Sequence, residues 1–222
     1  AVPAVNADPP SRVAPGTACG FRIQNAGQSS YPGGWSNYRV CASYDGEAWF
    51  RIDTEYSDGA LRFRHEVERD LVMFACFAPF MTERYEALTE RARGSARARV
   101  IEIGRSVQGR PMNVVAFGDQ GRSVPRVWII ALQHPGETMA GFCAEGIVDR
   151  LLDESDEASA ALLAGAEVYV IPRMNPDGSA IGNHRTNAAG LDLNRQWTAP
   201  SEEASPEVAS VVRALEAGGV DM

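Results

Sequence analysis

The sequence has no apolar run that approaches the ~20 residues needed to cross a bilayer, so we expect no membrane-spanning helix. Its first 15 residues are rich in proline and alanine and have neither a basic start nor an apolar core, which is unlike a signal peptide. None of the four cysteines belongs to a C-x-x-C pair. We therefore expect four buried free thiols, a reducing compartment and a cytoplasmic location.

Negative charge outnumbers positive charge, with 29 acidic against 21 basic residues and a formal net charge of -8 at pH 7. An acidic surface argues against nucleic acid and against anionic membranes as the main partners, since both repel it. The sign of the charge is reversed over residues 171–197, which hold three arginines and two aspartates. Such a stretch in an acidic protein is suited to hold a small anionic group.

The first half of the chain has the alternation of antiparallel strands. Asp45-Gly46 and Asp58-Gly59 are hairpin turn sequences between apolar segments. The expected strands lie at 38–44, 49–52, 61–65 and 71–78, the last being apolar enough for burial on both faces. A helix is expected at 82–93, capped by Thr82. We expect a flexible segment at 1–16 and a β-sandwich domain at 17–93.

The second half has a different pattern, which begins after the small and polar residues around Gly94. Its expected strands lie at 100–103, 112–117, 127–132 and 168–171. A helix at 139–152 separates the last two, and this order implies an α/β sheet with a parallel crossover. A further helix is expected at 206–215, with Ser205 as its cap and proline in its first turn. Residues 218–222 are typical of the first residues of a further strand.

Candidate metal ligands follow the strand at 127–132. His134 and Glu137 are three residues apart, so both can face one point if a helical turn joins them. Both are good zinc ligands, and α/β proteins place their sites at the ends of strands. The same spacing occurs at His65 and Glu68, which we assign to a solvated surface strand. The pair alone also fits a loop histidine that is hydrogen-bonded to a carboxylate.

Several motifs occur in one order along the second half. They are GRSVQGRP at 104–111, HPGE at 134–137, NPDG at 175–178, GNHR at 182–185 and DLNR at 192–195. With these motifs the chain resembles the zinc metallocarboxypeptidases, in their cytosolic-type branch, from about residue 17 onward. The resemblance implies a β-sandwich followed by a mixed-sheet α/β peptidase domain, here at 94–222. It also implies one Zn2+ ion and hydrolysis of the last peptide bond of peptides or proteins by metal-activated water.

The resemblance assigns roles to individual residues. His134 and Glu137 match the metal ligands of the family. Arg185 matches the residue that polarises the scissile carbonyl and stabilises the oxyanion. Asn194 and Arg195 match the pair that binds the terminal carboxylate, for which a guanidinium offers two parallel donors. The NPDG motif is expected to bend the chain beside the metal and not to take part in catalysis.

A catalytic zinc site also needs a third protein ligand and a general base. We do not choose His184 as the ligand, because its neighbour Arg185 must point into the site and adjacent residues of an extended segment face opposite ways. The resemblance places the third ligand and the catalytic glutamate beyond Met222. We therefore expect the peptidase domain to be incomplete at its C-terminus, and this stretch alone to be inactive.

Other functions stay open from the residues themselves. Zinc acylases of the aspartoacylase and succinylglutamate desuccinylase type share the H-x-x-E and Asn-Arg pairs, but differ from this chain at residues 196–198. A non-catalytic module that binds C-termini would keep Asn194 and Arg195 equally well. Taken alone, Arg185 and Arg195 also fit surface ion pairs with Asp192 or a nearby glutamate. For a peptidase, the local arginines are compatible with acidic, glutamate-terminated substrates.

Overall fold

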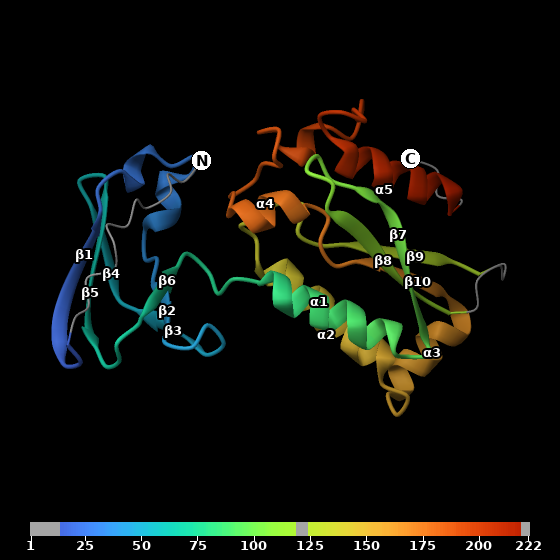
Figure 1. Ribbon diagram of the computed structural model, residues 1–222, viewed down its shortest axis with the longest axis horizontal. Helices are drawn as coiled ribbons and strands as arrows, with labels where there is room; N and C mark the ends of the chain where they lie inside the picture. The colour runs from blue at the N-terminus through green and yellow to red at the C-terminus, as the bar shows by residue number, and fades with distance from the viewer. Residues whose placement is uncertain (1–13, 119–123, 219–222) are drawn as a thin grey trace. The chain divides into compact units, whose positions relative to one another are not determined.

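The computed structural model describes residues 14–118 and 124–218. The chain divides into two compact units, Ala1–Pro79 and Phe80–Met222, which are drawn in Figure 1. No helix in the described ranges is long and apolar enough to span a membrane. Most of the segment expected to be flexible, at 1–16, lies outside these ranges.

The first unit is a sandwich of two three-stranded antiparallel sheets, with the strand orders β1-β5-β4 and β3-β2-β6. The strands are β1 (Thr17–Ile23), β2 (Val40–Ser43), β3 (Trp49–Ile52), β4 (Thr54–Ser57), β5 (Ala60–Val67) and β6 (Met73–Ala75), and two short 3-10 helices are η1 (Ala26–Gln28) and η2 (Pro32–Trp35). Side chains from both sheets form one buried cluster around Val40, Ala42, Ile52 and Phe63. The structure confirms the expected β-sandwich.

The hairpin turns form as their sequences indicate. Asp58 and Gly59 both have positive φ, 52° and 70°, as a tight turn between β4 and β5 requires. Asp45 opens a longer turn, because its side chain accepts from the backbone N–H groups of Glu47 and Ala48 at 2.9 and 2.8 Å. The strand expected at 71–78 shrinks to β6, an edge strand that is only partly buried.

The cysteines differ in part from expectation. All four lie in the described ranges and are free thiols. Cys41 is buried, whereas Cys76 and Cys143 are exposed. Flanking apolar residues therefore did not predict burial, because Cys76 follows the short edge strand β6 and Cys143 lies on the outer side of a helix.

The second unit is built on a four-stranded mixed sheet with the order β7-β8-β10-β9. Its elements are α1 (Thr82–Arg93), β7 (Ala98–Arg105), β8 (Pro111–Phe117), β9 (Arg126–Ile130), α2 (Met139–Leu152), α3 (Glu157–Gly165), β10 (Glu167–Ile171), α4 (Pro176–Ile181), η3 (Leu193–Arg195) and α5 (Pro206–Ala217). β9 and β10 are parallel neighbours joined through α2 and α3, which confirms the crossover. The other strand pairs are antiparallel.

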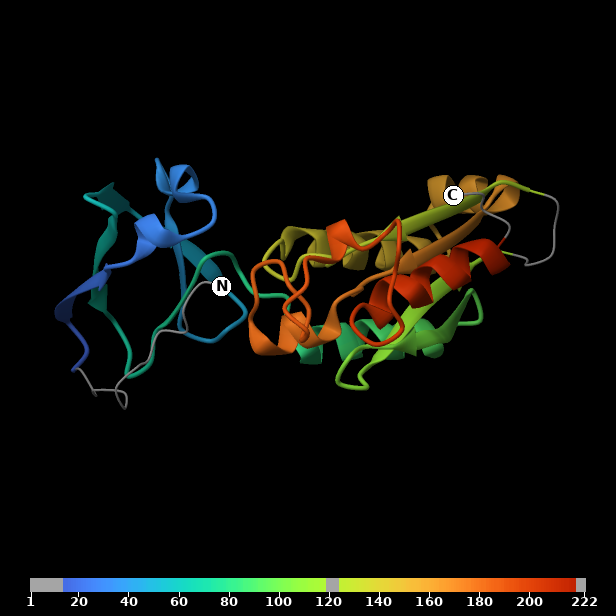
Figure 2. The same ribbon diagram turned by 90° about the horizontal axis from the view of Figure 1, so that it is seen from above.

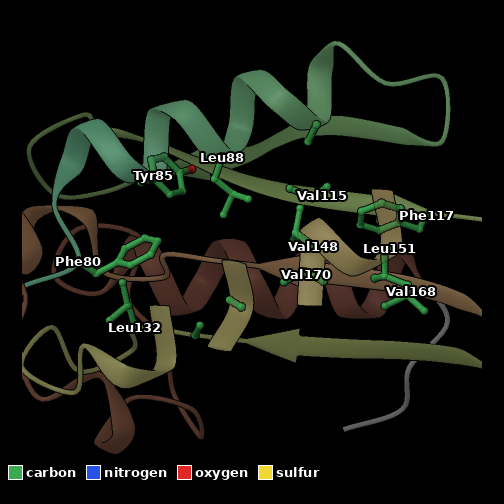
Figure 3. Packing of buried hydrophobic residues seen from close by; sticks show 13 residues of the cluster. Phe80, Tyr85, Leu88, Val115, Phe117, Leu132, Val148, Leu151, Val168 and Val170 are labelled. Carbon is green, nitrogen blue, oxygen red and sulfur yellow. The ribbon is translucent and has the colours of Figure 1, made fainter. Parts of the chain in front are cut away.

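Helices cover both faces of this sheet, α1 and α2 on one and α5 on the other (Figures 1 and 2). Figure 3 shows the first of these cores, in which Leu88, Val148 and Leu151 pack against the sheet. Successive residues of the central strand β8 alternate between the two cores, with Val115 in one and Val114 in the other. Burial of each such side chain stabilises the fold by about 1.5–3 kcal/mol.

Helix α1 belongs to this second unit, because Tyr85 and Leu88 are buried in its core. The division of the chain therefore falls before the helix, whereas we expected a boundary after it. Thr82 is the first helical residue and not the cap, and its hydroxyl accepts a bond from Arg173 at 3.2 Å. Gly218 ends α5, and the rest of the strand expected at 218–222 lies outside the described residues.

Candidate metal and carboxylate site

The candidate site begins where β9 ends. Leu132 is buried and has a φ of 52°, a left-handed conformation that costs about 1–2 kcal/mol for a residue with a side chain. The neighbouring segment holds this backbone in place: Met174 N–H donates to Ala131 O at 2.9 Å, and Asn175 N–H donates to Leu132 O at 3.0 Å. The strained residue turns the chain out of the sheet just before the HPGE motif.

The two expected metal ligands face each other. His134 Nδ1 is 3.1 Å from Glu137 Oε1, and the backbone N–H of Glu137 donates to His134 O at 3.1 Å. A single turn therefore joins the two residues, as the sequence spacing requires. The His134 side chain is buried, while that of Glu137 is 48% exposed.

Two glycines let the motifs approach closely. A Cβ atom on Gly136 would lie 2.6 Å from the ring of His184. A Cβ atom on Gly178 would lie 2.5 Å from Thr186 O and 2.6 Å from the ring of Pro135. Glycine is required at these two positions by space and not by a positive φ.

Asp192 is a member of the site that the sequence suggested only as an ion-pair partner of Arg185 or Arg195, and its pair with Arg185 is present. Its Oδ1 is 3.0 Å from His134 Nε2, and its Oδ2 accepts from Arg185 Nε at 3.3 Å. Burial alone would raise the pKa of Asp192, but the backbone N–H of Asn194 and the side chains of His134 and Arg185 hold it below its ordinary value. A carboxylate on one ring nitrogen of a histidine favours the tautomer whose other nitrogen has a lone pair.

Arg185 lies in the same cluster and forms ion pairs with both of its carboxylates. Its Nη1 donates to Glu137 Oε1 at 3.2 Å, and its Nη2 is 3.1 Å from His134 Nε2. The ring of the adjacent His184 packs against Gly136, which lies between the two expected metal ligands. Burial, followed by the charge of Arg185, lowers the pKa of His184.

The Asn194–Arg195 pair occupies the adjoining turn η3, and both side chains are exposed. The backbone N–H of Asn194 donates to Asp192 Oδ1 at 3.0 Å. Arg195 donates to Asn194 O at 3.2 Å, and within the described ranges no ion pair engages its guanidinium. The structure thus brings four side chains into contact, and the exposed Asn-Arg pair lies just after one of them, Asp192, in the chain.

The sequence matches known families over most of its length. Residues 85–215 match the family described as zinc carboxypeptidase, and residues 11–77 match the cytosolic carboxypeptidase N-terminal domain. The chain belongs to the zinc carboxypeptidase family. The two matched ranges fall on either side of the division after Pro79.

Several relatives of this zinc carboxypeptidase chain are known. An uncharacterized protein of Zymomonas mobilis is 41% identical over 199 residues, which cover 90% of this chain and 52% of that protein. Human cytosolic carboxypeptidase 6 is 31% identical over 157 residues, with coverages of 67% and 31%. A metallo-carboxypeptidase structure from Pseudomonas aeruginosa superposes with a TM-score of 0.90 at 45% identity, covering 93% of this chain and 55% of that one. The chain spans about half the length of the first and third of these.

The NPDG segment of this carboxypeptidase chain has a structural role beyond the expected bend. It forms the first turn of α4, where the Asn175 side chain accepts from Gly178 N–H at 2.9 Å. Asp177 is fully buried and accepts from Ser106 Oγ at 2.8 Å, from the backbone N–H of Gln108 at 2.8 Å and from Arg110 Nη1 at 2.7 Å. This carboxylate therefore fixes the loop between β7 and β8 to the site.

A second buried network shapes the loop that leads to Asp192. Asn187 accepts from the backbone N–H groups of Ala189 and Leu191 at 3.0 and 3.1 Å. Its amide nitrogen donates to Glu207 Oε2 at 3.0 Å. Burial raises the pKa of Glu207, although this bond opposes the rise. The first turn of α5 thereby holds the loop in place.

The metal-binding capacity of the described residues can be judged from their donor atoms. No three His, Cys, Asp or Glu side chains in residues 14–118 and 124–218 form a group that could hold a metal ion. In the tautomer protonated on Nε2, which a carboxylate at that nitrogen favours, the lone pair of His134 Nδ1 faces the Glu137 carboxylate. A cation between these two electron-rich groups would stabilise both. An imidazole and a carboxylate are also a donor set that zinc favours. His134 and Glu137 therefore fit two of the three protein-ligand positions of a catalytic zinc site.

Proposed function

We propose that the protein is a zinc-dependent metallocarboxypeptidase that hydrolyses the C-terminal peptide bond of peptides or proteins. The observation that carries this proposal is the contact of His134 with Glu137 on one ring nitrogen and with Asp192 on the other. The arrangement occurs in a chain of the zinc carboxypeptidase family, at the motifs that resemble its metal ligands. The third ligand and the general base are proposed to come from residues outside the described ranges.

His134, through Nδ1, and Glu137 would hold one Zn2+ ion. When bound, the ion activates a water molecule and polarises the carbonyl group of the scissile bond. Asp192 would keep the proton on Nε2 of His134 in the metal-bound site and fix the orientation of the ring. Because the ring is buried and bonded on both nitrogens, it is ordered before any metal or substrate arrives.

Arg185 and Arg195 are proposed to act on different parts of the substrate. The exposed Arg195 offers paired N–H donors to the terminal carboxylate of a peptide, with Asn194 beside it, which makes the enzyme an exopeptidase. Arg185 is bonded to Glu137, and a Glu137 carboxylate engaged by a cation would bind Nη1 less strongly. Arg185 would then donate to the oxyanion that forms on the scissile carbonyl.

We also propose a preference for acidic C-terminal residues and a cytoplasmic location. Arg173, one of the three arginines in the basic stretch, does not contribute, because it is buried over the ring of Tyr85 at 3.8 Å. Arg185 and Arg195 remain as the cations that could attract an acidic substrate. The P. aeruginosa relative is known in complex with (2-guanidinoethylmercapto)succinic acid. Its two carboxyl groups support a carboxylate-binding site, whereas its guanidino group does not favour an acidic side chain. The similarity of this chain to cytosolic carboxypeptidases supports the proposed cytoplasmic location.

A peptide assay on the full-length protein tests the proposed function. Peptides that end in Glu, Lys or Leu are compared with the same peptides carrying a C-terminal amide. We expect release of the last residue from free acids only, and fastest for Glu. Cleavage of N-acetylaspartate with intact peptides would instead indicate a zinc acylase. Peptide binding without hydrolysis would indicate a non-catalytic module.

A further inference from the structure

A separate concentration of arginines lies on the sheet β1-β5-β4 of the first unit. The strand register places Arg22 directly opposite Arg62, with Arg64 two residues further along β5. Successive strand residues point to opposite faces, so these three side chains share the outer face. Phe21 and Phe63 point to the inner face, where their rings stack with centroids 5.0 Å apart.

The positive charge on this face is only partly compensated. Arg62 donates to Ser57 O and Oγ at 3.0 and 2.7 Å and lies opposite Glu55 in the register. Arg22 and Arg64 have no hydrogen bond or ion pair from their side chains to any residue of the ranges 14–118 and 124–218. Like charges directly opposite each other destabilise a strand pair, so the arginines at 22 and 62 make the sheet less stable than a neutral pair would.

A hollow of about 700 Å³ lies over these residues. Its lining includes Gly20, Arg22, Arg62 and Arg64. Gly20 lies opposite Arg64, and a Cβ atom built on it would meet nothing within 4 Å. The glycine therefore leaves open space beside Arg64 on this face of the sheet.

Carboxylates border the arginines without neutralising them. Asp53 lines the hollow but is paired with Arg39 at 2.9 Å, and its side chain is 94% exposed. Glu55 accepts from Ser57 Oγ at 2.8 Å. Glu66 shares the outer face but lies beyond the lining. The acidic groups of the lining are thus on the β4 side, and the unpaired guanidinium groups are on the β1 and β5 side.

We propose that this face binds an acidic peptide segment whose carboxylates are held by Arg22 and Arg64. The planar guanidinium group binds a carboxylate through two parallel N–H donors, and all 21 basic residues of this chain are arginines. The choice of a peptide as carrier of the carboxylates rests on the proposed function. The acidic residues on the β4 side confine the positive charge to β1 and β5, which suits a short acidic segment better than a long polyanion such as a nucleic acid.

Fluorescence anisotropy with the full-length protein tests this site. The probe is fluorescein-labelled hexaglutamate with a C-terminal amide, which lacks the free terminus that Arg195 would take. We expect binding that weakens as salt is added, and no binding of the matched hexaglutamine. The double substitution Arg22→Gln and Arg64→Gln should weaken binding about tenfold or more. Gly20→Glu should also weaken it, because its carboxylate would occupy the space beside Arg64, and the melting temperature should not fall.

Two controls separate this site from other effects. Arg69→Gln removes one positive charge, half of what the double variant removes, from an exposed residue that lies over Tyr44, and should leave affinity unchanged. His134→Ala should bind the probe as the wild type does, so a failure of the proposed peptidase activity would not affect this result. The proposal is overturned if Arg69→Gln weakens binding as much per charge as the double variant. It is also overturned if hexaglutamine binds equally, or if a single-stranded oligothymidylate binds more tightly than hexaglutamate.

Discussion

Asp192 Oδ1 lies 3.0 Å from the His134 ring nitrogen Nε2, while the other ring nitrogen faces Glu137. These residues are far apart in the chain, and the loop organised by Asn187 brings the carboxylate to the imidazole. An imidazole held in this way cannot rotate without breaking a charged bond. The proposed metal site therefore depends on a residue that would not itself bind the metal.

The first prediction concerns this positioning residue. Asp192→Asn should lower zinc affinity by roughly 10- to 100-fold, as removal of an outer-shell partner of a metal-bound histidine does. Competition with a chromogenic chelator measures the affinity, and Glu47→Gln in the first unit serves as a control. Unchanged zinc affinity in Asp192→Asn, with an unchanged melting temperature, would show that the carboxylate does not position His134.

A second prediction concerns recognition of the substrate terminus. Arg195→Ala should lower kcat/KM for peptides with a free C-terminus by about 100-fold, since it removes a paired charge-assisted contact. Arg195→Lys should recover only part of the loss, because a lysine cannot make two parallel bonds. Steady-state kinetics of the full-length protein measures both variants. Wild-type kinetics in Arg195→Ala would rule out this residue as the carboxylate anchor.

A third prediction separates a buried ion pair from an exposed one. Asp177→Ala leaves Arg110, Ser106 Oγ and a backbone N–H without their acceptor, and should lower the free energy of unfolding by about 2–4 kcal/mol. Glu102→Ala removes the exposed partner of Arg105 and should change the free energy of unfolding by less than about 0.5 kcal/mol. Urea unfolding measures both. Equal effects would mean that the buried carboxylate does not anchor the loop between β7 and β8.

A fourth prediction uses pH. Asp156 caps α3, and its bond from Arg150, followed by that from Ser159 N–H, lowers the pKa of its carboxyl. A carboxyl with a lowered folded-state pKa stabilises the protein above the unfolded value of about 3.9, and this stability is lost as pH falls through the folded value. Asp156→Asn keeps a capping side chain but removes the charge. Its melting temperature should be below that of the wild type at pH 6–7 and should converge with it in acid; a constant difference would contradict this account.

Local sequence patterns were sufficient for much of the fold. The helix expected at 139–152 has these bounds in the structure, because its apolar spacing and its place between two apolar strands are local signals. The approach of His134 to Glu137 also follows from spacing, since one turn joins them. Helix α3 was not expected, although Asp156 is a cap signal, because its alanine-rich sequence has a weak apolar periodicity.

Long-range contacts could not be predicted in this way. Asp177 contacts a loop about 70 residues earlier in the chain, and Glu207 contacts Asn187, which lies 20 residues earlier. No local spacing relates the members of either pair. His65 shows the same limit: it was expected on a solvated strand, but it is half-buried with Nε2 2.7 Å from the Tyr44 hydroxyl and its ring near Phe50 and Phe74. The sequence identifies the reactive residue types, and the tertiary contacts decide which of them meet.

Zinc content is the most direct test of the central claim. The full-length protein and its His134→Ala and His65→Ala variants are purified with zinc present, dialysed and analysed by atomic emission. We predict one zinc ion per chain in the wild type and in His65→Ala, and loss of zinc in His134→Ala with the fold retained by circular dichroism. Zinc retained in His134→Ala, or lost in His65→Ala, would contradict the assignment of the metal site to His134 and Glu137.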